Sequence, residues 1–220
     1  PARRPRMPQP LRLSPPAANL RPPDDLARRD GFRRIAGVDE AGCGPWAGPV
    51  VAAAVILKDL TLPVEIDDSK RLTHRQRERA YRVILESGDV GIGIVSAEEI
   101  DRQNIMRATL LAMQQAVDDL PRRPDLVLVD GNRAPTLDLP CRTIPHGDRL
   151  SYVIACASII AKVLRDDVMA FYDRLYPAYA FRISKGYGTK HHAQALMRHG
   201  PSFLHRLSFR PVKARVSAPP

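Results

Sequence analysis

The feature that most constrains the fold is a regular alternation of strand-like and helix-like segments between residues 34 and 175. Short runs rich in Val, Ala and Ile are separated by segments whose apolar residues recur every three or four positions. This alternation is typical of an α/β layer and argues against a β-sandwich or a helical bundle. We therefore predict an α/β fold with strands over residues 34–39, 49–57, 90–95, 126–130 and 141–145.

The helices follow from capping residues and apolar spacing. Thr73 is a candidate N-cap for a charged surface helix that runs to residue 86. Residues 96–99 form a capping box in front of one helix that continues to Pro121. Apolar residues from 153 to 175 repeat at helical spacing, which predicts a long helix packed across the sheet. The Gly/Pro-rich turn between the first two strands is short enough to favour an antiparallel hairpin.

The charge balance points to a polyanionic partner. The chain of 220 residues carries 34 Lys+Arg against 24 Asp+Glu, a net charge of +10. Basic surfaces bind nucleic acids because neutralised phosphates release counterions, although basic surfaces also occur without such a partner. The longest apolar run, Val50–Leu57, is far shorter than the roughly 20 residues of a membrane span. We therefore expect a soluble protein. The three cysteines show no CxxC spacing, and no secretory segment is visible, which predicts a reducing, cytoplasmic location. We also expect a monomer.

Both ends of the chain are basic. Residues 1–30 hold eight prolines and seven arginines with no apolar periodicity, which predicts a disordered tail. Either a solubilising tail or a duplex-binding arm fits this composition. We expect one folded domain over residues 31–212, with a C-terminal helical part, and a basic, Pro-containing tail over 213–220. Four more cations, Arg206, Arg210, Lys213 and Arg215, give the C-terminal end a second basic arm.

Four carboxylates stand where predicted strands or loops meet turns: Asp39, Glu40, Asp130 and Asp148. Magnesium and manganese prefer oxygen ligands, and a two-metal site can activate water and stabilise the leaving oxygen in phosphoryl transfer. In a basic protein a bound cation would also balance the charge of an acidic cluster. These acids therefore predict a metal site for phosphate chemistry.

Each acid taken singly also has an ordinary structural explanation. Asp39 and Glu40 could start the turn that follows them, Asp130 could form an Asx turn, and Asp148 could be the N-terminal acid of the long helix. Adjacent strand residues also face opposite sides of a sheet. Asp39 is therefore the firmer ligand of its pair, and Glu40 becomes one only if the glycines at 42 and 44 bend the chain.

Residues 37–45, Gly-Val-Asp-Glu-Ala-Gly-Cys-Gly-Pro, strongly resemble the N-terminal signature of bacterial ribonuclease HII. Further motifs of that family follow in order over about residues 32–212. They are Asp68-Ser69-Lys70, Val129-Asp130-Gly131-Asn132, Gly147-Asp148, the segment 157–166 and Lys185-Gly186-Tyr187-Gly188-Thr189. Ordered motifs over most of the chain are far more specific than any single one.

The resemblance implies an RNase H-like fold, a mixed five-stranded sheet flanked by helices with a C-terminal helical extension. It implies an endoribonuclease that hydrolyses the RNA strand of RNA–DNA hybrids and incises 5′ to single ribonucleotides in duplex DNA, leaving 5′-phosphate and 3′-hydroxyl ends. Carried over by position, the catalytic acids are Asp39, Glu40, Asp130 and Asp148. The first three would bind Mn²⁺ or Mg²⁺, as two ions in the catalytic complex, and Asp148 would help to position metal or water.

The resemblance also implies the residues that sense ribose. The family has a Gly-Arg-Gly tripeptide where this chain has Gly42, Cys43 and Gly44, so the amide contacts survive but a charged side chain is lost. We expect weaker substrate binding rather than an inactive enzyme, and a tolerated small residue rather than a thiol nucleophile at Cys43. Tyr187 matches the tyrosine that stacks on the sugar following the ribonucleotide.

Three lysines are candidate phosphate contacts, and the motif match favours the first two: Lys70, Lys162 and Lys185. We interpret His191 and His192 as surface residues. Two other classes of protein remain open. One is a non-catalytic module that binds hybrid or duplex, and the other is a different nuclease or recombinase on the same fold, which would cleave all-DNA duplex.

Overall fold

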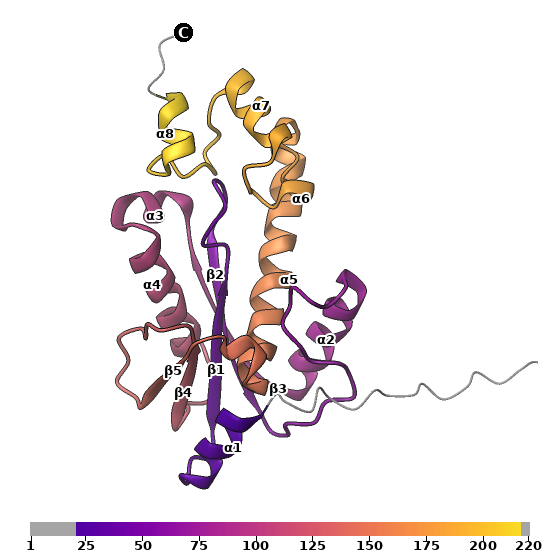
Figure 1. Ribbon diagram of the computed structural model, residues 1–220, viewed down its shortest axis with the longest axis vertical. Helices are drawn as coiled ribbons and strands as arrows, with labels where there is room; N and C mark the ends of the chain where they lie inside the picture. Colours follow the sequence, from indigo (N-terminus) through magenta and orange to yellow (C-terminus); the bar gives the residue numbers. More distant parts are fainter. Residues whose placement is uncertain (1–20, 217–220) are drawn as a thin grey trace, which may run out of the picture.

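The computed structural model describes residues 21–216, and a five-stranded sheet runs through its centre (Figure 1). The strand order is β3-β2-β1-β4-β5. The strands are β1 (Ile35–Ala41), β2 (Val50–Leu57), β3 (Gly88–Val95), β4 (Leu126–Asp130) and β5 (Cys141–Ile144). β1 pairs antiparallel with β2, and β2 with β3, whereas β4 is parallel to both β1 and β5. The predicted hairpin and the mixed five-stranded sheet are confirmed.

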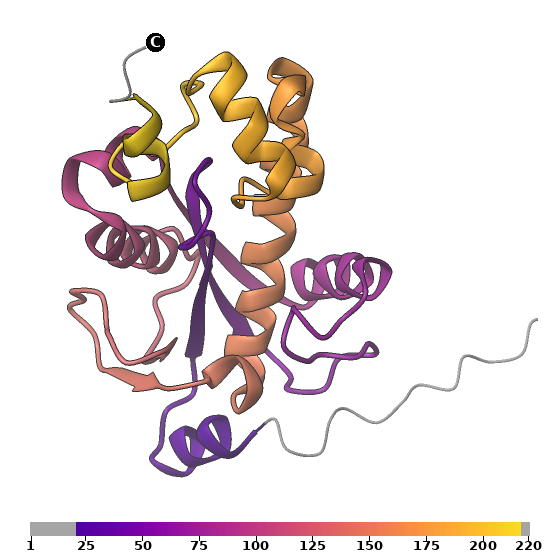
Figure 2. The ribbon, with the colours of Figure 1, turned by 45° about the horizontal axis from the view of Figure 1, so that its top comes forward.

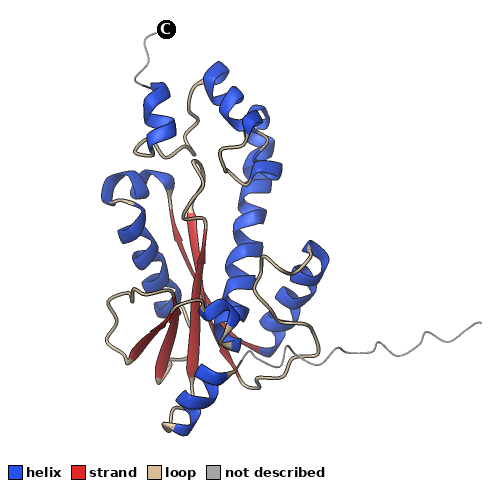
Figure 3. Ribbon diagram, in the orientation of Figure 1, coloured by secondary structure: helices blue, strands red, loops and turns tan. Residues whose placement is uncertain are grey.

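Helices cover both faces of the sheet (Figure 3). The α-helices are α1 (Pro22–Arg29), α2 (His74–Ser87), α3 (Ala97–Gln103), α4 (Ile105–Asp118), α5 (Tyr152–Leu175), α6 (Phe181–Ser184), α7 (Lys190–His199) and α8 (Arg210–Val216); the 3₁₀ turns are η1 (Gly147–Arg149) and η2 (Pro177–Tyr179). α5 and α2 pack on one face, and α4 packs on the other. Figures 1 and 2 show α1 at one end of the molecule and α6, α7 and α8 at the other.

The two faces of the sheet carry separate apolar cores. On β1, Ile35 belongs to the core beneath α5, while Ala36 and Val38 belong to the core beneath α4. A Cβ at Gly37 would overlap the backbone of Val153, so the missing side chain lets α5 lie directly on β1. This close packing sets the distance between the start of α5 and the carboxyl end of β1.

The segment predicted as one helix from residue 96 to Pro121 is in fact two. Asn104 has φ 78°, which interrupts the helix between α3 and α4. The Asn104 side chain accepts a hydrogen bond from the backbone N–H of Arg107 and so caps α4. Helical spacing of apolar residues continues across this break, which is why the periodicity alone did not reveal it.

The prediction of a disordered tail over residues 1–30 is wrong for residues 22–29, which form α1; residues 1–20 lie outside the described residues. Asp24 is fully buried and binds the first turn of α5. Its carboxylate accepts hydrogen bonds from Ser151 Oγ at 3.2 Å, the Tyr152 N–H at 2.9 Å and the Val153 N–H at 3.2 Å. The negative charge also lies at the positive end of a long helix. α8 likewise extends helix into the predicted tail over 213–220, as far as Val216.

Within residues 21–216, no helix combines the length and the apolarity needed to span a bilayer.

Replacing Asp24 with Ala should lower the free energy of unfolding by about 2 kcal/mol, because the first N–H groups of α5 lose their buried acceptor. Burial raises the pKa of Asp24, so the ionised carboxylate carries a desolvation penalty. Asp24→Asn removes this penalty and keeps one oxygen acceptor, so it should lower stability less than Asp24→Ala does. Urea unfolding at pH 7 measures both. The exposed neighbour Asp25 provides the control, since Asp25→Ala should change stability by less than about 0.5 kcal/mol. Equal losses at the two positions would contradict this account.

Candidate active site

Parallel pairing of β1 with β4 brings two of the predicted acids together. The register pairs Gly37 with Leu128 and Val38 with Val129, so the next pair along is Asp39 and Asp130. Side chains paired across parallel strands point to the same face, here the one covered by α5. The carboxylates of Asp39 and Asp130 therefore lie side by side at the carboxyl ends of neighbouring strands.

Asp39 is the most buried of the cluster, with 5% of its surface exposed. Burial raises its pKa well above the ordinary value, and the charges of Glu40 and Asp130 raise it further. A hydrogen bond from Ser158 of α5 and one from the Glu40 N–H, at 2.8 Å, oppose this rise. Ser158 in turn hydrogen-bonds Ser69 at 3.0 Å, which ties the loop before α2 to the site.

Glu40 lies on the opposite face of β1, as strand geometry requires, yet it remains part of the cluster. The Cys43 Sγ donates to its Oε1 at 3.4 Å, and both residues line a cavity of about 250 Å³ between α4 and the end of β4. Burial raises the pKa of Glu40, the charge of Asp130 adds to this, and Lys70 opposes it. The charge of Glu40 therefore raises the pKa of Asp39, although the two side chains leave opposite faces of the strand.

Asp130 and Asp148 are linked through the turn that precedes α5. The Gly147 N–H donates to Asp130 Oδ1 at 2.6 Å, and Asp148, the next residue, is 6% exposed. Burial and the nearby charges of Asp130 and Asp68 raise the pKa of Asp148, whereas Lys70 lowers it. Lys70 Nζ stands 3.8 Å from Asp148 Oδ2. All four predicted acids thus surround one end of the sheet.

The donor set fits divalent cations that share their coordination with substrate. Within residues 21–216, no three His, Cys, Asp or Glu side chains are arranged to hold a single ion between them. Magnesium usually takes only one or two carboxylates from a protein and fills its other positions with water and phosphate oxygens. Mutually repelling, partly buried carboxylates such as Asp39, Glu40 and Asp130 are stabilised by such a cation.

Two buried arginines shape the loop that follows Glu40. Arg206 donates to the carbonyls of Gly42 at 2.6 Å, Cys43 at 3.0 Å, Pro45 at 2.8 Å and Gly48 at 2.9 Å. Arg165 of α5 donates to the carbonyls of Ala47, Pro49 and Lys185. These bonds occupy the carbonyls of six of the eight residues from 42 to 49 and connect the loop to the segment around Lys185.

This arrangement brings the predicted ribose-sensing residues together. A Cβ built on Gly44 would lie 3.5 Å from Tyr187 Cε1, so Gly44 and the half-exposed Tyr187 ring are neighbours. The Cys43 thiol, by contrast, turns toward Thr109 and Glu40. Burial and the charge of Glu40 raise the pKa of Cys43 to about 12, which keeps the thiol protonated and argues against a thiolate nucleophile.

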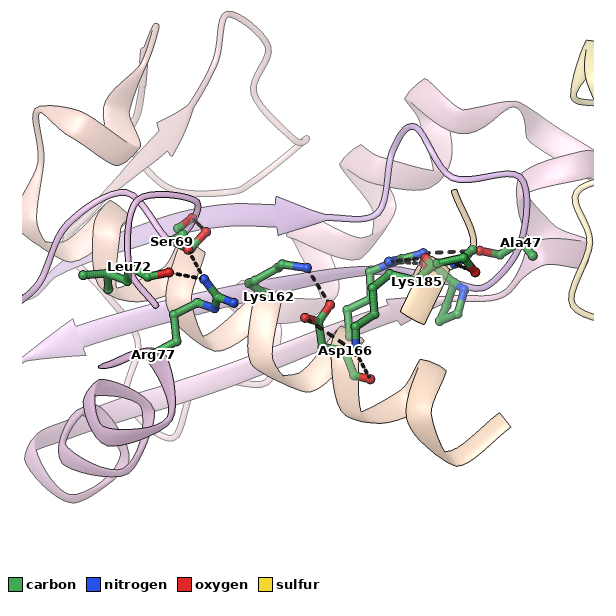
Figure 4. Close-up of polar contacts among 12 residues, drawn as sticks. Ala47, Ser69, Leu72, Arg77, Lys162, Asp166 and Lys185 are labelled. Carbon is green, nitrogen blue, oxygen red and sulfur yellow. Dashed lines mark hydrogen bonds and ion pairs between the residues drawn. The ribbon is translucent and has the colours of Figure 1, made fainter. Parts of the chain in front are cut away.

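The three candidate lysines lie beside two different acids. Lys70 lies beside Asp148, while Lys162 and Lys185 lie on either side of Asp166 (Figure 4). The Lys162 ion pair measures 2.6 Å, and Lys185 Nζ stands 3.8 Å from the same carboxyl group. Lys162 is therefore part of a separate cluster on α5 rather than of the acidic site.

Sequence reasoning missed the roles of several buried residues. Arg206, interpreted as part of a basic arm, is fully buried, and so is His192, interpreted as a surface residue. His192 and His205 form a hydrogen-bonded pair behind Tyr187. The resemblance marked the Arg165 segment without a role for its side chain. Composition does not distinguish a buried arginine from a surface one. The burial of Arg206 becomes visible only in the structure, where the loop carbonyls surround its guanidinium.

Comparison with known proteins decides the family. Residues 36–212 match the family model described as ribonuclease HII. The ribonuclease HII of Syntrophus aciditrophicus is 52% identical over 185 residues, which cover 84% of this chain and 87% of that protein. The chain belongs to the ribonuclease HII family. Ribonuclease HII is a metal-dependent endoribonuclease that cleaves RNA in RNA–DNA hybrids and at single embedded ribonucleotides, and this is the activity of the chain.

Solved structures bear out the RNase H-like fold. The ribonuclease H2 of Pyrococcus horikoshii OT3 superposes with a TM-score of 0.69 at 22% identity, covering 83% of this chain and 96% of that one. Bst-RNase HIII in complex with Mn²⁺ gives a TM-score of 0.60 at 21% identity, covering 84% of this chain and 69% of that one.

Gly42 should tolerate no side chain in this ribonuclease HII. Its φ is +102°, and a Cβ would overlap the Arg165 guanidinium and lie 2.8 Å from the Pro49 carbonyl. Gly31, with φ +96° and no heavy atom within 4 Å of its Cβ position, is the matched control. Gly31→Ala should show only backbone strain, about 1–2 kcal/mol. Gly42→Ala should lose roughly 2 kcal/mol more in urea unfolding, because strain and overlap combine. Equal losses would show that Arg165 moves aside freely.

Proposed function

We propose that Asp39, Glu40 and Asp130 bind two Mn²⁺ or Mg²⁺ ions and that Asp148 completes the site for hydrolysis on the 5′ side of a ribonucleotide. The observation that carries the proposal is the convergence of partly buried, mutually repelling carboxylates at the carboxyl ends of β1 and β4. The Mn²⁺ held by Bst-RNase HIII, which shares the fold, supports a divalent ion here. The products would be 5′-phosphate and 3′-hydroxyl ends.

The ions, when bound, would supply a more acidic water and charge to offset that of the scissile phosphate. Asp39 and Asp130 hold their carboxylates on one face of the sheet and Glu40 holds its carboxylate on the other, and these three residues would hold the ions at the end of the strands. The Gly147 N–H fixes Asp130 Oδ1, which leaves Oδ2 for a cation. Asp148, beside Lys70, would help to position a metal or water.

Ribose recognition would fall to the loop at 42–44 and to Tyr187. A protein tells RNA from DNA by the 2′-hydroxyl, and backbone amides at glycine positions can approach it closely. The arginine bonds to the Gly42 and Cys43 carbonyls support this role, because they orient the peptide groups of the loop. The exposed Tyr187 ring would stack on the neighbouring sugar. Lys70 would contact phosphate near the acids, and Lys162 with Lys185 would do so farther along the duplex.

We also propose a monomer that works in the reducing cytoplasm. All three cysteines of the chain are free thiols, which fits such a compartment. Sedimentation of the purified chain tests the monomer.

The deciding experiment uses a labelled DNA duplex with one ribonucleotide, incubated with Mn²⁺, Mg²⁺ or chelator. Asp130→Asn should lower kcat on the order of a thousandfold or more, since a neutral amide cannot balance metal charge but keeps the oxygen that Gly147 binds. Asp138→Asn, at an exposed acid away from the cluster, is the control and should cleave normally.

Each alternative has its own outcome in this assay. Binding without incision in any metal would indicate a non-catalytic module, whereas cleavage of the all-DNA duplex would indicate a different nuclease. Full activity of Asp130→Asn would refute the proposed metal site.

Restoring the family arginine should strengthen substrate binding. Cys43→Arg adds a cation beside the ribonucleotide, and one charged contact is worth roughly a tenfold lower Kd. The cavity next to Cys43 offers room for the longer side chain. Fluorescence anisotropy with chelator present measures Kd without turnover, and Cys43→Ser serves as the uncharged control. Unchanged or weaker binding by Cys43→Arg would contradict the assigned role of this position.

A further inference from the structure

Two histidines 13 residues apart in the sequence meet behind the Tyr187 loop. His192 lies on α7 and His205 in the segment before α8, and both are buried, with 0% and 2% of their surface exposed. Their Nε2 atoms are 2.9 Å apart. His192 Nδ1 lies 2.8 Å from the Tyr187 carbonyl oxygen, and the Ser202 N–H points at His205 Nδ1 from 2.9 Å. A continuous chain of hydrogen bonds thus runs from Ser202 to Tyr187.

The groups at the two ends determine every proton in this chain. The Ser202 N–H can only donate, so His205 Nδ1 is the acceptor and His205 carries its proton on Nε2. The Ser202 hydroxyl lies 2.9 Å from the same Nδ1 and can donate to it as well. The His205 Nε2 proton is donated to His192 Nε2, so His192 carries its own proton on Nδ1. The Tyr187 carbonyl can only accept, and it receives the Nδ1 proton. Two neutral rings with opposite tautomers satisfy all the partners.

The surroundings favour the neutral pair. Aromatic rings enclose the pair. The ring centroid of Tyr179 lies 4.8 Å from that of His205, and the centroids of Phe181 and Trp46 lie 5.5 Å and 5.7 Å from that of His192. Burial lowers the pKa of His192, and burial together with the neighbouring ring lowers the pKa of His205 to about 4. An added proton would set two N–H groups against each other between the rings.

The chain of hydrogen bonds ends at the backbone carbonyl of Tyr187, and the side-chain ring of Tyr187 takes no part in it. The Tyr187 N–H donates to the Ser184 carbonyl at 2.8 Å, and the His192 bond holds the carbonyl on the other side of the same residue. The ring itself is half-exposed beside Gly44. Arg206, the residue after His205, binds the carbonyls of Gly42 and Cys43. One short C-terminal segment therefore holds both parts of the proposed ribose-sensing surface.

We propose that His192 and His205 are positioning residues for substrate recognition: their fixed pair of tautomers holds the Tyr187 backbone so that its ring faces the ribose-sensing loop. The proposal rests on the role of Tyr187 proposed above. It gives the C-terminal helical part a function in selecting the RNA–DNA junction, distinct from the acids that carry out hydrolysis.

A double-mutant cycle tests the positioning role. His192→Phe keeps a ring in the aromatic cluster but removes the imidazole donor to the Tyr187 carbonyl, which then retains the bond from the Thr189 N–H. It should raise KM for a duplex with one ribonucleotide about five- to tenfold, with a smaller change in kcat. His192→Asn keeps a donor near the Nδ1 position and should recover most of this loss. His199→Phe, at an exposed histidine of the same helix, is the control and should match the unmodified protein.

The decisive comparison adds each change to Tyr187→Ala. If His192 acts through Tyr187, the double variant should be no worse than Tyr187→Ala alone, whereas a general structural role gives additive losses. Additive losses, or an unimpaired His192→Phe, would overturn the positioning role. If Tyr187→Ala itself cleaves normally, the proposed function of Tyr187 fails instead, so the two failures are distinguishable.

A second measurement does not depend on activity or on a variant that folds. Nitrogen-15 NMR of the imidazole rings distinguishes the two neutral tautomers and the charged form. At pH 7 His192 should carry its proton on Nδ1 and His205 on Nε2, with the exposed His199 ring as the reference. The reverse tautomers, or a charged ring at pH 7, would overturn the proposed hydrogen-bond chain.

Discussion

The site depends on the parallel pairing of β1 with β4. This pairing ends both strands at the same edge and sets Asp39 beside Asp130, so two negative charges meet where α5 begins. Burial raises the pKa of Asp39, and the charges of Glu40 and Asp130 raise it further, so the cluster of carboxylates is electrostatically unfavourable. A cation removes that repulsion, which explains why an arrangement that costs stability serves metal-dependent chemistry.

The remainder of the structure holds this edge in place from outside the sheet. Asp24 on α1 binds the first turn of α5, and the turn before α5 places Gly147 against Asp130. Gly37 lets α5 approach β1 closely enough for Ser158 to reach Asp39. A segment that precedes the residues matched by the family model is thus joined to the acids by packing and hydrogen bonds.

The loop after Glu40 and the Tyr187 segment, to which we assign ribose recognition, are held by a different part of the chain. Arg165 and Arg206 satisfy the carbonyls of the loop after Glu40, and their own charges are desolvated in doing so; burial lowers the pKa of Arg206 to about 10. A guanidinium suits this task because its donors diverge in one plane and reach several carbonyls at once. Loop, Tyr187 segment and C-terminal helices are consequently one hydrogen-bonded unit next to the acids.

The sequence by itself determined the fold class and most strand and helix bounds, and it pointed to the four acids that the proposed metal site uses, because these depend on local spacing and on ordered motifs. Helical spacing could not reveal the break at Asn104, and composition could not reveal α1, since eight residues with one buried carboxylate leave no periodic signal. Only the tertiary structure decided that Glu40 joins Asp39 from the opposite face of a strand, and that Arg206 and His192 are buried partners of a loop. The reason is that the partners of these side chains lie in other segments of the chain. Arg206 binds carbonyls of the loop after Glu40, and His192 binds the carbonyl of Tyr187, and neither contact can be inferred from the residues next to them in sequence.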